Sequence, residues 1–187
     1  MLVSLTWGLR ILVVAGLAAV TGCGPSTRSA DAPLPATDWH EFQGTWTAAG
    51  SRQTIRLGGD QRASIGSFDG SLLLTGPSRP SVGFRAQAIA LNDSASGMVG
   101  RFVWTDERGD QMFGELQGEV TATGNRIIGT FTGGTGRYSG ATGSYEFSWR
   151  FVLENEDGVV QGQSMGLKGR VRGGSPQAVP GAGGTRQ

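Results

Sequence analysis

Few residues in this sequence of 187 have the types and spacing that catalysis needs. The only histidine, His40, stands between Trp39 and Glu41. In a catalytic triad, a histidine acts as the base for a nucleophile and is oriented by a carboxylate. Being neighbours in sequence does not create that geometry, so we expect an exposed His40 and assign no catalytic residue. We also expect no cofactor and no metal site, because Cys23 is the only cysteine available to join His40 as a ligand.

A second candidate for acid–base chemistry is the pair Glu115 and Glu119, which alternate along one segment with small and apolar residues. Paired carboxylates serve as acid and base when one of them is buried and its pKa is raised. The opposite face of the segment carries Met112, Leu116 and Val120. We predict that this apolar face points inward and that both glutamates are solvated.

Aromatic residues are the best candidates for a binding surface. The proposed pocket lining consists of Phe84, Trp104, Tyr145, Phe147, Trp149 and Phe151. Small residues at other predicted inward positions, such as Ala88 and Gly114, remove interior volume. Either the aromatic rings fill that volume as core or a ligand cavity remains, and the sequence leaves both outcomes open.

Between Trp46 and Val171, hydrophobic residues recur at every second position, which is typical of β-strands. We expect such strands to position the residues named above. Turn signals separate the runs, among them Asp69-Gly70, Asn92-Asp93 and Asp157-Gly158. We predict an all-β fold, a single antiparallel up-and-down β-barrel of about eight strands, because closure removes the two exposed edges of a meander. A barrel of this size is filled by side chains or holds one small ligand.

The segment from Phe131 to Trp149, FTGGTGRYSGATGSYEFSW, places a glycine-rich stretch before an aromatic strand. Glycine permits positive φ, bulges and close approach of the backbone. We therefore predict an ordered barrel corner. Its structural turn glycines are Gly133, Gly134, Gly136, Gly140 and Gly143.

The same segment, together with the acidic stretch ERGDQMFGE before it, resembles the allene oxide cyclase-like and dirigent-like (calycin-type) barrels. The resemblance covers about Thr105 to Phe151 and rests on turn residues, so it transfers no catalytic residue. It implies a closed barrel, a cyclase, isomerase or radical-coupling activity as one alternative, and a homo-oligomer as a candidate state. The charged residues 106–110 are interpreted as a polar turn.

A shorter motif, Gly44-Thr45-Trp46, resembles the G-x-W at the start of the first lipocalin strand. In lipocalins this tryptophan closes one end of the barrel, often against an arginine near the last strand. The resemblance implies that Arg170 or Arg172 contacts Trp46 here.

The two ends of the chain indicate export and lipid attachment. Residues 1–22 combine Arg10 with a short apolar run and end in VTG before Cys23, which resembles a lipoprotein signal peptide and lipobox. Cys23 is therefore the predicted lipidation site, and the tether of residues 23–38 is rich in Pro, Ser and Ala. Gly24 follows the cysteine in place of an aspartate, which favours the outer membrane, facing the periplasm. The barrel domain is placed at 39–172 and a disordered tail at 173–187.

Charge excludes one class of function. Removal of residues 1–22 takes away one of 16 basic residues, Arg10, and none of the 15 acidic ones, so the net charge is near zero. The basic surface expected of a nucleic-acid binder is missing. The preferred hypothesis is a non-catalytic, lipid-anchored envelope barrel that binds a small hydrophobic ligand or an envelope partner. The alternatives are an enzyme of the resembled type and a purely structural module.

Overall fold

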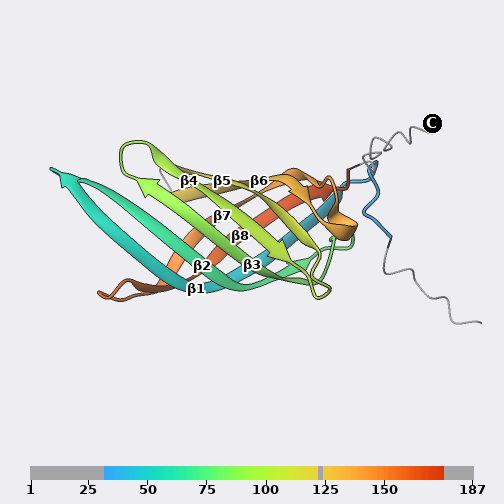
Figure 1. The fold of residues 1–187 in the computed structure, drawn as a ribbon, viewed down its shortest axis with the longest axis horizontal. Helices are drawn as coiled ribbons and strands as arrows, with labels where there is room; N and C mark the ends of the chain where they lie inside the picture. Colours follow the sequence, from blue (N-terminus) through green and yellow to red (C-terminus); the bar gives the residue numbers. More distant parts are fainter. Residues whose placement is uncertain (1–31, 122–123, 175–187) are drawn as a thin grey trace, which may run out of the picture. The chain divides into compact units, whose positions relative to one another are not determined.

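The computed structural model describes residues 32–121 and 124–174, which form eight antiparallel strands closed into one barrel (Figure 1). The strands are β1 (His40–Gly58), β2 (Gln61–Thr75), β3 (Gly83–Asp93), β4 (Gly97–Thr105), β5 (Gln111–Thr121), β6 (Gly124–Gly134), β7 (Thr142–Glu154) and β8 (Val159–Arg172). A turn of 3-10 helix, η1 (Gly136–Tyr138), separates β6 from β7. The predicted signal peptide, the lipidation site Cys23 and most of the predicted tail lie outside the described residues.

Each strand pairs with its neighbours in sequence, and β8 pairs back onto β1, so the sheet has no edge. The prediction of an all-β, up-and-down barrel of about eight strands is confirmed. Alternation of side chains sets which residues face the interior: on β3, Phe84, Ala86 and Ala88 are buried. On β5, Met112 and Leu116 point inward, whereas Glu115 points outward and pairs with Arg101 at 2.8 Å.

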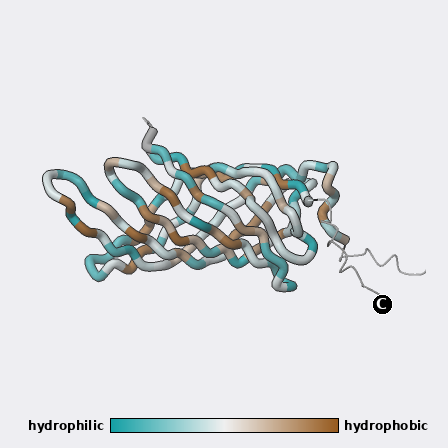
Figure 2. Tube along the Cα trace, turned by 45° about the horizontal axis from the view of Figure 1, so that its top comes forward, coloured by the Kyte–Doolittle hydropathy of each residue, from teal (hydrophilic) through white to brown (hydrophobic). Residues whose placement is uncertain are grey.

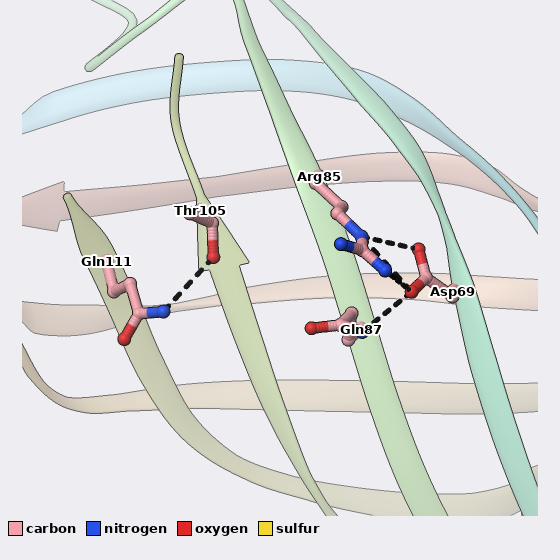
Figure 3. Close-up of polar contacts among 5 residues, drawn as sticks. All are labelled: Asp69, Arg85, Gln87, Thr105 and Gln111. Carbon is pink, nitrogen blue, oxygen red and sulfur yellow. Dashed lines mark hydrogen bonds and ion pairs between the residues drawn. The ribbon is translucent and has the colours of Figure 1, made fainter. Parts of the chain in front are cut away.

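One turn prediction was wrong. Asp69-Gly70 lies in the middle of β2, where Gly70 pairs with Ala48 on one side and Ala86 on the other. The Asp69 carboxylate points outward and accepts hydrogen bonds from Arg85 and Gln87 of β3 (Figure 3). A Cβ on residue 70 would lie 2.0 Å from the carbonyl oxygen of Thr47, so glycine serves close strand approach here. Figure 3 also shows the outward bond from Gln111 to Thr105, which joins β5 to β4.

The two ends of the barrel differ in what covers them. We call the end with the β4–β5 turn and the β6–β7 loop the closed end (Figure 1). The described chain also enters there, because the Leu34 N–H donates to the Arg137 carbonyl oxygen at 2.9 Å. The opposite end, formed by the β1–β2, β3–β4 and β7–β8 hairpins, is called the open end.

A buried polar cluster fastens the closed end. The charged residues 106–110 do form a turn, but Asp106 is not a solvated tip residue, because its side chain is fully buried. One carboxylate oxygen accepts the backbone N–H groups of Arg108 and Asp110 at 2.9 and 3.0 Å. The other lies 2.9 Å from the Arg137 guanidinium, which donates to the Tyr138 hydroxyl at 2.6 Å. The β4–β5 turn and the β6–β7 loop are thereby joined.

The glycine-rich segment is an ordered corner in the structure. Gly136, Gly140 and Gly143 have φ angles of +52°, +67° and +137°, a region in which L side chains are strained. Gly133 and Gly134 belong to the end of β6, opposite a register shift in β5. The segment after them folds over the closed end and buries Tyr138 and Ala141 completely.

Aromatic rings fill the interior towards the closed end. Trp104 is the centre of this group, with ring centroids 4.6 Å from Tyr145, 5.1 Å from Phe131 and 5.7 Å from Phe84. Burial raises the pKa of Tyr145 well above its ordinary value, so the phenol is neutral, and Trp104 gives it a side-chain hydrogen bond. This half of the barrel is a packed core.

Large aliphatic side chains on the outer wall gather towards the open end, and Figure 2 shows hydrophobic segments in the hairpins there. Ile65, Leu91 and Val99 are exposed and directly paired across β2, β3 and β4. Leu153 is also exposed, although it lies two residues after the inward-facing Phe151 and regular alternation would turn it inward. The register of β7 against β8 shifts between these two residues, and such a bulge turns the next side chain outward.

Candidate ligand pocket at the open end

The interior contains a pocket of about 150 Å³ towards the open end. Its aromatic lining residues are Trp46, Phe68, Phe147, Trp149 and Phe151. Its smaller and aliphatic lining residues are Gly66, Ala88, Ala90, Met98, Leu116 and Ile127. Polar side chains at the pocket are Arg52, Ser64, Asn92 and Asn125. The wall is therefore mostly apolar, with a few polar groups, as is typical of small-molecule sites.

The pocket exists because small residues face large ones. Gly66, Ala88 and Ala90 occupy the inward positions of neighbouring strands β2 and β3, where Gly66 pairs with Ala90. The rings of β1 and β7 come from the other side of the barrel, with Trp46 and Phe147 centroids 6.1 Å apart. The Phe68 ring occupies the space over Gly66, where an added Cβ would lie 2.8 Å from it. The methyl groups of Ala88 and Ala90 are too short to meet the opposite rings, so the volume beside them stays open.

The backbone of Trp46 is positioned by a buried serine. The β1–β8 ladder is interrupted between Gly44 and Thr47, which leaves the Trp46 N–H without a ladder partner. The Ser164 hydroxyl accepts that N–H at 2.8 Å, and Ser164 itself is buried. On its other side Ser164 is paired with Trp149. Ser164 thus stands between the two tryptophans.

The backbone of Trp149 is positioned in a similar way by an asparagine. The β6–β7 ladder ends at the pair Ile127 and Phe147 on the way to the open end. Beyond it, the Asn125 side chain accepts the Trp149 N–H at 3.0 Å and lies 3.4 Å from the Trp149 carbonyl oxygen, to which it donates. The indole ring packs over Gly162, where an added Cβ would lie 2.6 Å from it.

The two indoles are the most unusual polar groups of the pocket. Their ring centroids lie 4.9 Å apart with a tilt of 50° between planes. Both Nε1 atoms are buried, and neither has a hydrogen-bond acceptor among the described residues. Buried polar groups are normally paired, and an unpaired one costs about 1–3 kcal/mol. Trp104 in the packed core is different, because its side chain bonds with Tyr145.

Arg52 is the only ionisable side chain among the described residues that line the pocket. Its guanidinium carbon lies 5.2 Å from the centroid of the Phe151 ring, and it donates to the Glu154 carboxylate at 2.5 Å. The arginine charge is therefore neutralised at the rim. Among the described residues, the interior wall itself carries no charge.

Three of the six aromatic residues proposed for the lining do line this pocket, namely Phe147, Trp149 and Phe151. The other three, Phe84, Trp104 and Tyr145, lie in the packed core towards the closed end. These three residues are part of the core because their rings contact one another directly: Trp104 packs against both Phe84 and Tyr145. Sequence reasoning missed Phe68, Ser164 and Asn125, which no local pattern distinguishes.

The lipocalin-like contact was placed on the wrong tryptophan. The guanidinium groups of Arg170 and Arg172 lie 4.6 and 4.9 Å from the ring of Trp39, at the closed end. Trp46 lies seven residues further along the chain, within the interruption of the β1–β8 ladder, and contacts the aromatic rings of the pocket. The last-strand arginines and Trp46 are thus separated along the barrel.

The remaining candidates lie away from the pocket. His40 Nδ1 is 2.7 Å from the Ser78 carbonyl oxygen at the closed end. In residues 32–121 and 124–174, no three His, Cys, Asp or Glu side chains are grouped so that they could hold a metal ion. A wider, open groove of about 830 Å³ runs over the outer wall of β6, β7, β8 and β1. Three of its charged side chains are engaged with one another, since Glu146 pairs with both Arg126 and Lys168.

Comparisons of the chain with protein-family models, with curated proteins and with solved structures returned no match. Among the described residues there is also no helix of sufficient length and apolarity to traverse a lipid bilayer. The geometry of the pocket is therefore the basis for the functional proposal.

Proposed function

We propose that this protein is a ligand-binding β-barrel that holds a small, mainly apolar molecule in the pocket at its open end. The observation that supports the proposal best is the contrast between the two halves of one interior. The half towards the closed end is packed with aromatic rings, whereas the half towards the open end leaves about 150 Å³ beside five aromatic side chains. Protein interiors are normally closely packed. A cavity of this size at one end therefore supports a role in binding a small molecule.

The proposal includes attachment to the cell envelope through a lipid on Cys23. The tether would reach the barrel at the closed end, where Leu34 bonds to the β6–β7 loop. The pocket lies towards the other end, so an anchor at Cys23 would leave the open end free to receive a ligand. An outer-membrane position facing the periplasm is part of the same proposal and rests on the lipobox-like sequence and Gly24.

Native mass spectrometry on the full chain purified from its own host tests both parts. We expect an extra mass that is retained in the folded protein and lost on denaturation. We also expect the denatured chain to begin at Cys23 and to carry acyl mass there. A denatured mass equal to the unmodified 187 residues would contradict the anchor without bearing on the pocket.

A matched pair of variants assigns the retained mass to the pocket. Ala90→Leu adds three carbons to a pocket-lining position, so it should abolish retention. Ala49→Leu makes the same change at an exposed position on the outer wall of β1 and should leave retention unchanged. Equal retention by both variants would place the molecule elsewhere and contradict the proposed binding site.

A further inference from the structure

We infer that the ligand is a hydrocarbon chain with a phosphate head group, whose apolar end enters the pocket and whose head group lies between Arg56 and Arg62 of the β1–β2 hairpin. This inference rests on the proposed function and specifies the chemistry of the ligand. It combines three observations: a hairpin that projects beyond the barrel, two arginines without an acidic partner on its pocket side, and the open volume next to them.

The β1–β2 hairpin projects past the neighbouring β3–β4 and β7–β8 hairpins, at the left of Figure 1. The pairing of β1 with β8 ends at Ser51, and the pairing of β2 with β3 begins only at Ala63. Residues 53–62 therefore form a two-stranded ribbon that only the β1–β2 ladder holds together. The pocket side of this ribbon continues the inner wall of the barrel.

Alternation of side chains places Arg56 and Arg62 on the pocket side of the ribbon. Arg52 of β1 and Ser64 of β2 line the pocket. The register of β1 against β2 is unbroken from that level to the pair Arg56 and Arg62. Residues an even number of positions apart on a strand share a face. Both arginines are exposed, so a ligand that leaves the pocket can reach them.

Arg56 and Arg62 stand directly opposite each other on the two strands. Like charges at such positions destabilise a strand pair. Among the described residues no ion pair joins either guanidinium to an acid, including Asp60 at the tip of the same hairpin. The carboxylates of the neighbouring turns, Asp93 and Asp157, accept backbone N–H groups of their own turns. An anion between the two arginines would offset their repulsion.

Charge balance favours a phosphate over a carboxylate as this anion. A phosphate monoester has a charge of about −1.5 to −2 at pH 7, close to the sum of the two guanidinium charges, whereas a carboxylate has half of that. The planar fork of a guanidinium matches two phosphate oxygens at once. With three terminal oxygens, one phosphate can accept hydrogen bonds from both Arg56 and Arg62.

The pocket and its distance from the arginines define the apolar body. The volume of about 150 Å³ equals that of a dry cavity that holds benzene, so it accepts about six carbons. Arg62 is two residues beyond the pocket-lining Ser64, about 7 Å along the strand. The Ser64 and Thr54 hydroxyls bond to each other at 2.8 Å, so no charge lies on this path. A chain of about ten carbons therefore joins the pocket to the head group.

The test compares n-decyl phosphate, n-decanol and inorganic phosphate, each below any micelle-forming concentration. Affinities come from NMR titrations that follow the pocket methyl groups of Met98, Leu116 and Ile127 and the ³¹P resonance. An exposed ion pair contributes a factor of up to about five in affinity. We expect Arg56→Gln/Arg62→Gln to bind decyl phosphate about ten-fold more weakly than the wild-type chain. Decanol should bind both chains equally.

Matched variants separate a site from a general effect of charge. Arg79→Gln/Arg150→Gln removes the same charge at exposed positions outside the pocket lining and should leave the affinity for decyl phosphate unchanged. Equal losses in the two double variants would overturn the inference. Because Arg56→Gln/Arg62→Gln removes a repulsion between exposed side chains, urea unfolding should find it at least as stable as the wild-type chain.

The remaining outcomes separate this inference from the proposed function. Unchanged affinity of Arg56→Gln/Arg62→Gln for decyl phosphate, with shifts of the pocket methyl groups, would overturn the head-group site and leave the ligand-binding barrel standing. The same holds if toluene shifts these methyl groups and neither decyl probe does. Shifts with none of the three would contradict both.

Inorganic phosphate is the probe for an anion site that is independent of the pocket. We expect it to bind much more weakly than decyl phosphate, and we expect Ala90→Leu to weaken the binding of decyl phosphate. Equal affinity for the two phosphates, or an affinity for decyl phosphate that Ala90→Leu does not change, would show that the arginines bind free phosphate. Either result would overturn the inferred link between head group and pocket.

Discussion

The Ser164 hydroxyl accepts the backbone N–H of Trp46 at 2.8 Å inside the barrel wall. This bond replaces a missing rung of the β1–β8 ladder, and Ser164 is at the same time paired with Trp149 of β7. The side chain of Ser164 therefore positions the Trp46 backbone, and the backbone of the same residue pairs with Trp149.

Ser164→Ala should destabilise the protein and disturb the pocket together. The substitution leaves the buried Trp46 N–H without an acceptor, which costs about 1–3 kcal/mol of unfolding free energy. Chemical denaturation measures the loss, and the Trp46 indole resonance should shift. Ser148→Ala, at an exposed position of β7, is the control and should change neither. Equal stability of the two variants would contradict the role given to Ser164.

Gly129 should tolerate no side chain, because the Tyr145 ring lies over it. A Cβ on residue 129 would be 2.2 Å from two carbons of that ring. Gly129→Ala should therefore cost about 1–3 kcal/mol through overpacking. Gly83→Ala is the matched control, since its nearest neighbour would be 3.5 Å away. A loss confined to Gly129→Ala, measured by denaturant unfolding, is the expected result; similar losses would mean that the ring can move aside.

Removing the carboxylate of Asp106 should open the closed end. Asp106→Ala leaves the Arg137 guanidinium, whose side chain is 15% exposed, without its acidic partner. It also removes the acceptor of two backbone N–H groups. Breaking such a buried pair costs about 3–5 kcal/mol. Hydrogen exchange should become faster in residues 106–110 and 135–141, whereas Glu107→Ala, at an exposed position of the same turn, should have little effect.

Stability should fall when the pH is lowered below the ordinary pKa of the acidic residues on the outer wall. Hydrogen bonds from Arg85 to Asp69 and from Arg126 to Glu146 hold the pKa of each carboxyl below its ordinary value. A carboxyl whose pKa is lower in the folded state stabilises the protein above its unfolded pKa, and this contribution is lost as the pH falls through the folded pKa.

Asp69→Asn and Glu146→Gln should therefore reduce stability at pH 7 and lose their effect in strong acid. Both carboxylates are solvated, so each difference should be small. Urea unfolding of each variant beside the wild type, from pH 7 down to pH 2, gives the comparison. If the stability difference between variant and wild type instead grew as the pH fell, the result would contradict the lowered pKa values of Asp69 and Glu146.

The sequence was sufficient for the architecture because alternation is a local property. Phe84, Ala86 and Ala88 on β3, like Met112 and Leu116 on β5, could be assigned to the interior from spacing alone. The closure of the sheet followed from the need to remove exposed edges. The solvated position of Glu115 followed from the same alternation.

The pocket could not be located from the sequence because it depends on register between distant strands. Trp46 and Ser164 are 118 residues apart, and the interruption in the β1–β8 ladder that brings them together has no local signal. The same holds for the shift that turns Leu153 outward and for the burial of Asp106 in a charged turn. Aromatic residues at equivalent inward positions therefore looked alike, although half of those proposed belong to the core and half to the pocket.

The most direct test of the ligand-binding account is a methyl NMR titration of the full chain with toluene, a neutral ring of suitable size. Met98, Leu116 and Ile127 line the pocket, whereas Leu72, Met112 and Val171 are buried outside its lining. The account predicts saturable shifts confined to the first three residues and abolished by Ala90→Leu. Shifts spread over exposed side chains such as Ile55 and Val99, or no saturable shift in the pocket, would contradict it.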